Sequence, residues 1–248
     1  MIDQIRQFAK EAGAKEACGF VETDGQRLRA VQTNNLAPNP SFNFVVDVAG
    51  AYMESQKAGR LVGYWHTHPP GSPTQFSDED KAVAESLAKP CWLYCADNDK
   101  LTVYTPTGYR PPLEGRSFIP FVQDCFALVR DYYSEKLGID IPDVERDETD
   151  YNEGHKSFGA FLASIGAVRI VGKPQKHDVL AITTRTRTGR PNHFAVYVGN
   201  GLMLHQVRGK RSGFDLWAGY WQNNTATIWR HPKLCSQPLH STESSAKP

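Results

Sequence analysis

The spacing of apolar positions predicts a succession of helices and short strands in the first half of the chain. Apolar side chains recur at helical spacing over residues 2–14, so this segment predicts a helix that ends near Gly13. Residues 48–58 and 77–87 also predict helices. Short apolar runs predict strands, namely ACGFVET, LRAVQTN, FNFVVD, LVGYWHTH, CWLYCA and KLTVYTP. The mixture predicts one mixed α/β domain over residues 1–107.

A second group of elements follows a segment that lacks apolar periodicity. The sequence TPTGYRPPLEG is rich in Pro and Gly, so residues 108–117 predict a linker. Residues 124–137 and 157–165 then predict helices, and five strands follow as VRIVG, DVLAITT, HFAVYVGN, GLMLHQVRG and ATIWRHP. We therefore expect a second domain over residues 118–232 and the α+β class for both domains. The polar residues 233–248 predict a disordered tail.

Length and charge narrow the classes of function. The chain has 248 residues, which is long for one compact domain and suits two. Its 28 basic and 27 acidic residues nearly cancel, which argues against nucleic acid and anionic membranes as partners. We expect no signal peptide and no membrane span. Five cysteines at scattered positions argue against a disulfide framework, so we expect free thiols and synthesis in a reducing cytoplasm.

Two histidines end the predicted strand LVGYWHTH. Because residues two apart in a strand point to the same side, His66 and His68 project together. Asp80, in the first turn of the next predicted helix, is able to supply an oxygen ligand. Two His and one carboxylate leave an open position on zinc, which is typical of a catalytic site. A capping box formed by Ser77 and Asp80 is the structural alternative for this helix start.

The segment HTHPPGSPTQFSDED resembles the His-x-His…Ser-x-x-Asp signature of the JAMM metallopeptidases, which have an MPN-type fold. KEACGF resembles the family's upstream Glu-x-Cys-Gly block. The resemblance implies a zinc-dependent amide or isopeptide hydrolase in which Zn²⁺ is bound by His66, His68 and Asp80. It further implies Glu16 as general base and acid, and Ser77 as a residue that holds the oxyanion. Eight residues separate His68 from Ser77, one more than is usual in the family.

The predicted helix over residues 124–137 begins next to a cysteine. The helix dipole lowers the pKa of a thiol at a helix N-terminus, which makes Cys125 a candidate nucleophile. Such a thiol needs a histidine base and a third group that orients the base. His193 and His205, in two later predicted strands, are the candidates for these roles. The alternative is that Cys125 is a small buried hydrophobic side chain and that both histidines are ordinary strand residues.

The block DCFALVR resembles the Asp-Cys block of the NlpC-type cell-wall cysteine peptidases, which have a papain-like core. HFAVYVG and MLHQ resemble the family's later strands. The resemblance implies Cys125 as nucleophile, His193 as base and His205 as orienting residue, with Asp124 in support. Ala127 stands where Gly is commoner in the family. The implied substrates are peptidoglycan stem peptides, cleaved at the γ-D-glutamyl–diaminopimelate bond.

The order of the two domains resembles that of the tail assembly proteins of lambda-like, long-tailed phages. This resemblance implies synthesis in the host cytoplasm, a place at the phage tail tip or in the virion, and action in the host cell envelope. It implies other tail-tip proteins as partners beside peptidoglycan stem peptides. The expected lack of an export signal fits a wall peptidase that a particle carries to the wall. The alternative function is an assembly module of the tail tip in which one or both sites are silent.

Overall fold

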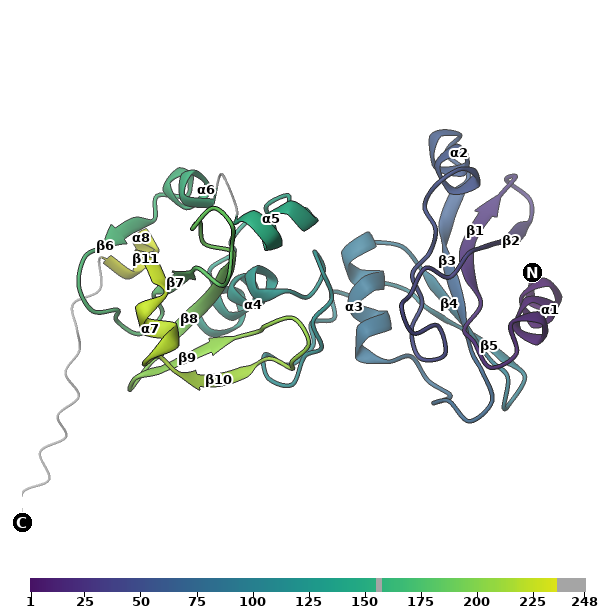
Figure 1. Ribbon diagram of the computed structural model, residues 1–248. Coiled ribbons are helices and arrows are strands. Elements are labelled where there is room, and N and C mark those ends of the chain that lie inside the picture. Colours follow the sequence, from purple (N-terminus) through teal and green to yellow (C-terminus); the bar gives the residue numbers. More distant parts are fainter. Residues whose placement is uncertain (155–157, 236–248) are drawn as a thin grey trace, which may run out of the picture. The chain divides into compact units, whose positions relative to one another are not determined.

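The computed structural model describes residues 1–154 and 158–235 (Figure 1). The chain divides into two compact units, of which the first is Met1–Pro111 and the second begins at Pro112. Each unit has its own sheet and its own apolar core. Both units combine helices and strands, which confirms the α+β class. Within the described residues, no helix is long and apolar enough to cross a membrane.

The first unit is built on a five-stranded sheet with the strand order β2-β1-β3-β4-β5. β1 pairs with β2 and with β3 in antiparallel fashion, and so does β4 with β5, but β3 and β4 are parallel. Because parallel neighbours need a crossover, α3 lies in the connection from β3 to β4. The elements are α1 (Ile2–Ala12), β1 (Cys18–Thr23), β2 (Leu28–Thr33), α2 (Ala51–Lys57), β3 (Leu61–His68), α3 (Asp78–Leu87), β4 (Cys91–Cys95) and β5 (Lys100–Tyr104).

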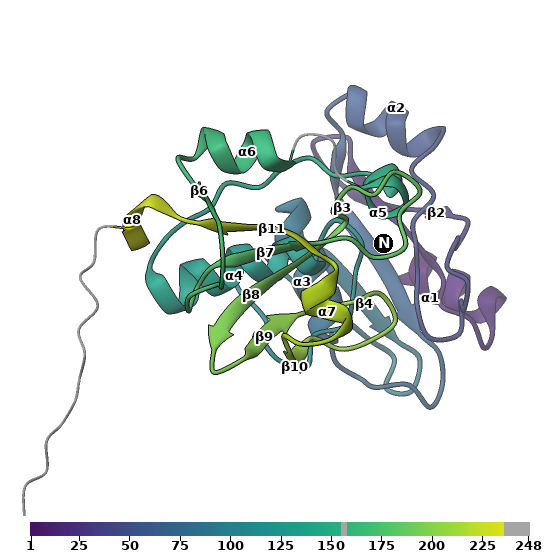
Figure 2. The same ribbon diagram turned by 60° about the vertical axis from the view of Figure 1, so that its left-hand side comes forward.

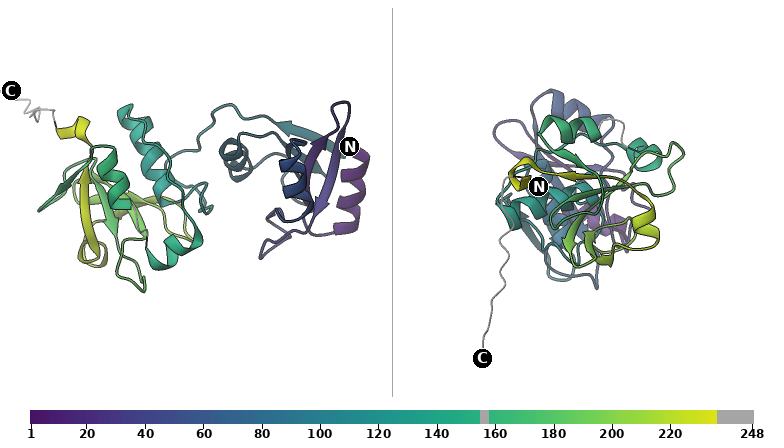
Figure 3. Two further views of the ribbon diagram at one scale, coloured as in Figure 1. Left: turned by 90° about the horizontal axis from the view of Figure 1, so that it is seen from above. Right: turned by 90° about the vertical axis from the view of Figure 1, so that its left-hand side faces the viewer.

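Helices cover both faces of this sheet. Ile5 of α1 packs with Trp65 of β3 on one face, whereas Ala84 of α3 packs with Tyr64 of β3 on the other. Figures 1 and 3 show α1 and α3 on opposite sides of these strands. Since side chains alternate along a strand, the two histidines that end β3 share the α3 face with Tyr64. The sheet therefore directs both histidines toward the helix that carries Asp80.

The second unit is built on a six-stranded sheet with the strand order β10-β9-β8-β7-β11-β6, and neighbouring strands pair in antiparallel fashion (Figure 2). Its helices are α4 (Cys125–Leu137), α5 (Glu148–Glu153), α6 (Phe158–Ser164), α7 (Tyr220–Asn223) and α8 (Pro232–Cys235). Its strands are β6 (Val168–Ile170), β7 (Val179–Ile182), β8 (His193–Gly199), β9 (Leu202–His205), β10 (Gly213–Leu216) and β11 (Thr225–Arg230).

The long helix α4 packs against one face of this second sheet. Phe126 of α4 is fully buried and meets Phe158 of α6 and Phe194 of β8 edge to face. The opposite face carries a smaller apolar cluster, against which Trp217 and Trp221 pack. The aromatic contacts anchor the start of α4 to β8, so the first residue of the helix is held near the first residues of that strand.

The predicted strand FNFVVD is wrong. This segment forms an isolated bridge between Asn35 and Val46 rather than a ladder, and Phe44 stacks on His66 with ring centroids 4.2 Å apart. Its apolar residues are therefore explained partly by packing beside the candidate metal site. The predicted disorder over residues 233–248 is wrong at its start, because α8 extends to Cys235, and the rest of that prediction lies outside the described residues.

Besides α8, three short elements, α5, β10 and α7, have no counterpart in the sequence prediction. α5 lies in a segment rich in acidic residues between α4 and α6, and Asp147 begins it with a capping box rather than with apolar spacing. β10 leaves Phe214 and Leu216 exposed, so it lacks the alternation of buried and exposed positions on which strand prediction depends. Elements of this length carry too few periodic positions to be distinguished from loops.

Candidate active sites

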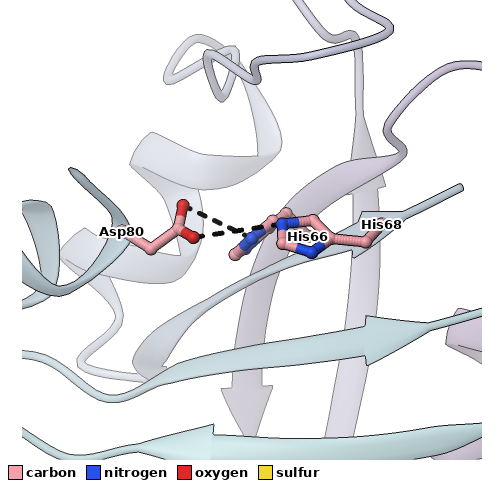
Figure 4. A group of neighbouring side chains, drawn as sticks. All are labelled: His66, His68 and Asp80. Carbon is pink, nitrogen blue, oxygen red and sulfur yellow. Dashed lines mark ion pairs between the residues drawn. The ribbon is translucent and has the colours of Figure 1, made fainter. Parts of the chain in front are cut away.

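The end of β3 and the first turn of α3 bring three candidate metal ligands together. His66, His68 and Asp80 are buried, and one ligand atom of each lies within 4.8 Å of the others (Figure 4). His66 Nε2 lies 3.4 Å from Asp80 Oδ1, and His68 Nε2 lies 4.0 Å from Asp80 Oδ2. Both imidazoles thus direct the same ring nitrogen toward one carboxylate.

Neighbouring groups hold the two imidazoles. The Nδ1 atom of His68 is 2.6 Å from the carbonyl oxygen of Pro73. Because a carbonyl oxygen only accepts, Nδ1 carries the proton, and Nε2 is left with a lone pair for a metal. The Nδ1 atom of His66 lies 3.6 Å from the sulfur of Cys91, a buried free thiol. These contacts leave both Nε2 atoms available on the side of Asp80.

The capping box that was the structural alternative is present at the start of α3. The Asp80 amide donates to the Ser77 hydroxyl at 3.0 Å, and the Ser77 amide donates to Asp80 Oδ2 at 2.8 Å. The other oxygen of the same carboxylate, Oδ1, faces His66, and His68 lies nearer to Oδ2. The capping box and the metal site are therefore compatible interpretations of this segment, because the cap orients the candidate ligand Asp80.

Glu16 lies beside this cluster. Burial raises the pKa of its carboxyl to about 7, which His66 opposes and Asp80 reinforces. The backbone of Glu16 is fixed on both sides, since its amide donates to the Pro40 carbonyl at 2.7 Å and its carbonyl accepts from Asn35 Nδ2 at 2.9 Å. A carboxyl group that titrates near neutral pH is able both to take and to give a proton.

The donor set fits a divalent cation such as Zn²⁺. His66 Nε2 is buried and, among the residues that the structure describes, has no hydrogen-bond partner. Burial lowers the pKa of His66, but the Asp80 carboxylate raises it, and the net shift is upward. The space between these side chains therefore favours positive charge. Two imidazole nitrogens and a carboxylate oxygen are ligands that zinc binds in proteins.

In the second unit, Cys125 is the first residue of α4. Asp124 caps this helix, because its side chain accepts a hydrogen bond from the Ala127 amide at 2.8 Å. Cys125 is 3% exposed, and its sulfur receives a hydrogen bond from the backbone of Phe194. The fold thus brings the thiol beside the residue that follows His193 in β8.

The two candidate histidines of this unit meet across neighbouring strands. His193 begins β8 and His205 ends β9, and His193 Nε2 lies 2.9 Å from His205 Nδ1. Both rings are buried. Trp221 of α7 lies edge-on to His205, with ring centroids 4.7 Å apart, and at 5.6 Å from His193. The indole therefore shields the pair from solvent.

The predicted low pKa of Cys125 is wrong for this structure. Burial raises the pKa of the thiol to about 12, the Asp124 carboxylate adds to the rise, and backbone hydrogen bonds offset only part of it. Burial also lowers the pKa of His193 to about 3, and His205 adds to this shift. The helix dipole is thus outweighed by desolvation. At neutral pH the resting groups are a thiol and a neutral imidazole.

Sequence reasoning missed Asp215, whose Oδ2 atom lies 3.0 Å from His205 Nε2. It also missed the position of Trp221 over the histidine pair. A signal for Asp215 exists in the hairpin that follows MLHQ. In the β9–β10 pair, Gly213 stands opposite His205, and Asp215 is two residues further on and therefore on the same side.

The comparisons with known proteins assign a family to each unit. Residues 107–230 match the model of the NlpC/P60 family, and residues 1–106 match that of prokaryotic homologs of the JAB domain. The two matches thus define a protein with a JAB-like domain followed by an NlpC/P60 domain.

Two curated phage proteins are similar over most of the chain. Tail tip assembly protein K of Escherichia phage lambda is 30% identical over 183 residues, which is 73% of this chain and 86% of that protein. Tail tip assembly protein K of Escherichia phage N15 is 27% identical over 234 residues, which is 93% of each. The chain belongs to the NlpC/P60 family and, within it, to the K-type tail tip assembly proteins of lambda-like phages.

Two solved NlpC/P60 family structures are more distant. A protein from Staphylococcus aureus, described as similar to lipoprotein, is 17% identical with a TM-score of 0.31, and one from Bacillus cereus is 13% identical with a TM-score of 0.33. The matches cover 93% and 91% of this chain, and 61% and 66% of those proteins. TM-scores this low add nothing to the fold assignment.

Proposed function

We propose that the second unit is a cysteine peptidase that cleaves peptidoglycan stem peptides, with Cys125 as nucleophile, His193 as base and His205 as orienting residue. The observation that carries this proposal is the buried 2.9 Å contact between the two histidines, next to the backbone that reaches the Cys125 sulfur. A thiol at a helix start, with a buried pair of imidazoles on the strands that pack against that helix, supplies the groups that acyl transfer needs.

The direction of proton transfer follows from the contacts. His205 engages His193 Nε2, so Nδ1 of His193 is the nitrogen left to take the Cys125 proton. As the S–H bond breaks, the sulfur bonds to the substrate carbonyl carbon, and the carbonyl π pair moves to oxygen. When this pair returns, the C–N bond breaks and the proton on His193 passes to the leaving amine. Water then hydrolyses the thioester, which releases a carboxylic acid and restores the thiol.

We also propose that the first unit is a zinc-dependent amide or isopeptide hydrolase. His66, His68 and Asp80 would hold Zn²⁺, which supplies a Lewis acid that polarises a carbonyl. Glu16 is the group that takes and returns a proton, because burial brings its pKa to about 7. The Ser77 hydroxyl accepts one hydrogen bond from the Asp80 amide, and its O–H would donate to an oxyanion when substrate is bound.

Membership of the tail tip assembly protein K family supports a proposal for where both activities occur. The protein would be made in the host cytoplasm, join other tail-tip proteins, and act on peptidoglycan in the host envelope. The first unit would then act on a tail protein during assembly or on a second wall bond.

The test of the second site is the cleavage of murein stem peptides, followed by mass spectrometry. Cys125→Ala is expected to abolish product formation, since it removes the nucleophile, while circular dichroism and the unfolding midpoint stay close to those of wild type. The matched control is Cys235→Ala, which removes an exposed thiol and should cleave like wild type. Full activity of the Cys125 variant would refute the assignment.

One observation favours a second candidate function, an assembly module with silent sites. Cys125 is almost fully buried, and its pKa of about 12 keeps it protonated at neutral pH. If wild type cleaves no stem peptide, either alone or in purified tails, the assembly role stands and the peptidase role falls. Cleavage that depends on Cys125 excludes a silent second site.

The test of the first site is metal content. We expect about one zinc per chain by elemental analysis, because the structure offers a single three-ligand set among its described residues. His66→Ala should lose the metal, and dialysis against EDTA should remove it from wild type. His231→Ala, in the second unit, is the control and should retain it. A folded wild-type protein that takes up no zinc would contradict the assignment.

A further inference from the structure

The hydrogen-bonded series in the second unit does not end at His205. His193 Nε2 lies 2.9 Å from His205 Nδ1, and His205 Nε2 lies 3.0 Å from Asp215 Oδ2. Asp215 belongs to β10 and is two residues from Gly213, which stands opposite His205 in the hairpin. Glycine leaves the space beside His205 open, so the Asp215 side chain reaches the ring diagonally across the strand pair.

We propose that Asp215 is a positioning residue that sets the tautomers of both histidines. An ionised carboxylate only accepts hydrogen bonds, so its contact requires the proton of His205 on Nε2. A neutral His205 then has a lone pair on Nδ1 and accepts from His193 Nε2–H. His193 in turn keeps its lone pair on Nδ1. One carboxylate on β10 thereby fixes the base nitrogen that Cys125 needs.

The alternative is a doubly protonated His205, which would donate to both neighbours and reverse the tautomer of His193. Burial, which lowers the pKa of His205, opposes this state. The charged or titratable groups around His205 are Asp215, Lys210 and His193, and the net shift of the pKa is downward despite Asp215. A neutral His205 is therefore the resting form, and its tautomer is what Asp215 decides.

Water is not an equivalent replacement for this carboxylate. The Asp215 side chain is 51% exposed, so water would enter if the carboxylate were removed. Water donates as well as accepts, and it therefore imposes no single tautomer on His205. Both histidines would then populate two tautomers, and part of the molecules would present an N–H rather than a lone pair to the thiol.

The primary experiment is ¹⁵N NMR of the imidazoles in the full chain at neutral pH, with signals assigned from His193→Gln and His205→Gln. Wild type is expected to show protonated Nε2 in both rings. Asp215→Ala is expected to mix the tautomers of both, Asp215→Glu to restore the wild-type pattern, and Leu216→Ala, on the same strand, to leave it unchanged. Wild-type nitrogen shifts in Asp215→Ala would overturn the proposal.

The kinetic consequence rests on the proposed peptidase function. In Asp215→Ala, kcat for stem-peptide cleavage should fall about tenfold with KM unchanged, and Asp215→Glu should recover most of it. An unchanged kcat in an active enzyme would also overturn the proposal. If wild type cleaves no peptide, the proposed function fails, and the nitrogen shifts decide the role of Asp215 independently.

Discussion

Asp124 is a fully buried carboxylate that pairs with an arginine and accepts a hydrogen bond from a tyrosine. Arg146 Nε lies 2.8 Å from its Oδ2 atom, and the Tyr151 hydroxyl donates to the same oxygen at 2.7 Å. The remaining oxygen accepts from the Ala127 amide at the start of α4. Asp124 thus supports Cys125 by fixing the helix start, although its charge also raises the pKa of the thiol.

Removal of Arg146 from its ion pair with Asp124 should destabilise the second unit. Arg146→Met leaves the buried carboxylate of Asp124 without its counter-charge, so the free energy of unfolding of the second unit should fall by about 3 kcal/mol. The matched control is Arg130→Met, because Arg130 pairs with Asp143 near the surface and exposed pairs contribute below about 1 kcal/mol. Urea unfolding of both variants checks this, and equal losses would contradict it.

For single residues, the sequence predicts which side chains belong to a candidate site better than it predicts their burial and their pKa. The positions of His66, His68 and Asp80 follow from strand and helix geometry, and the structure brings them together. The pKa of Cys125 could not be predicted, because it depends on burial by residues distant in sequence. Asp215 was missed because its role depends on the pairing of β9 with β10.

The start of α3 is an element-scale feature in which one residue has two structural tasks. Asp80 completes the capping box with Ser77 and faces both histidines. The helix therefore orients the candidate ligand only while its first turn is formed. Fraying of that turn would move the Asp80 carboxylate away from the two histidines.

Removal of the cap should therefore affect both stability and metal binding. Ser77→Ala is expected to cost the first unit about 1 kcal/mol in unfolding free energy. Its zinc affinity should fall about tenfold, because the first helical turn that orients Asp80 loses the hydrogen bond from the Asp80 amide to the Ser77 hydroxyl. Ser77→Thr keeps the hydroxyl and is the control. Chelator competition measures the affinity, and a wild-type value in Ser77→Ala would contradict this coupling.

The longer elements could be predicted from the sequence and the shortest could not. α1, β3, α3 and α4 have enough periodic positions to establish both type and approximate ends. FNFVVD has the composition of a strand, but its Phe44 ring packs on His66 instead of continuing a ladder. Burial by a distant partner thus produces the same apolar pattern as strand pairing.

For the whole molecule, the buried histidines link stability to pH. The folded pKa of His193 is about 3, whereas an exposed histidine titrates near 6.5. The unfolded chain therefore binds more protons than the folded one between these values. The resulting loss of unfolding free energy is absent above pH 6.5 and grows as the pH falls below that value. His205, whose pKa is also lowered, acts in the same direction.

We therefore expect acid to destabilise the second unit first through these rings. Its unfolding free energy should decrease by about 1.4 kcal/mol per pH unit below 6.5 for each histidine that stays neutral in the fold. Hydrogen exchange of the α4 amides at pH 7, 6 and 5 measures this. His193→Gln should show a shallower slope, and an identical slope would contradict the linkage.

The position of the two candidate sites along the chain has a consequence for biosynthesis. Glu16 and Asp80 bound the first site, and both belong to the unit that ends at Pro111, so a ribosome completes this unit before it reaches Cys125. The candidate residues of the second site extend along the sequence from Cys125 to Asp215. Most of the second unit must therefore emerge from the ribosome before these side chains can meet. The residues proposed to hold zinc can therefore meet early in synthesis, whereas translation that stops between the two units leaves a product that lacks Cys125 and both candidate histidines of the second site.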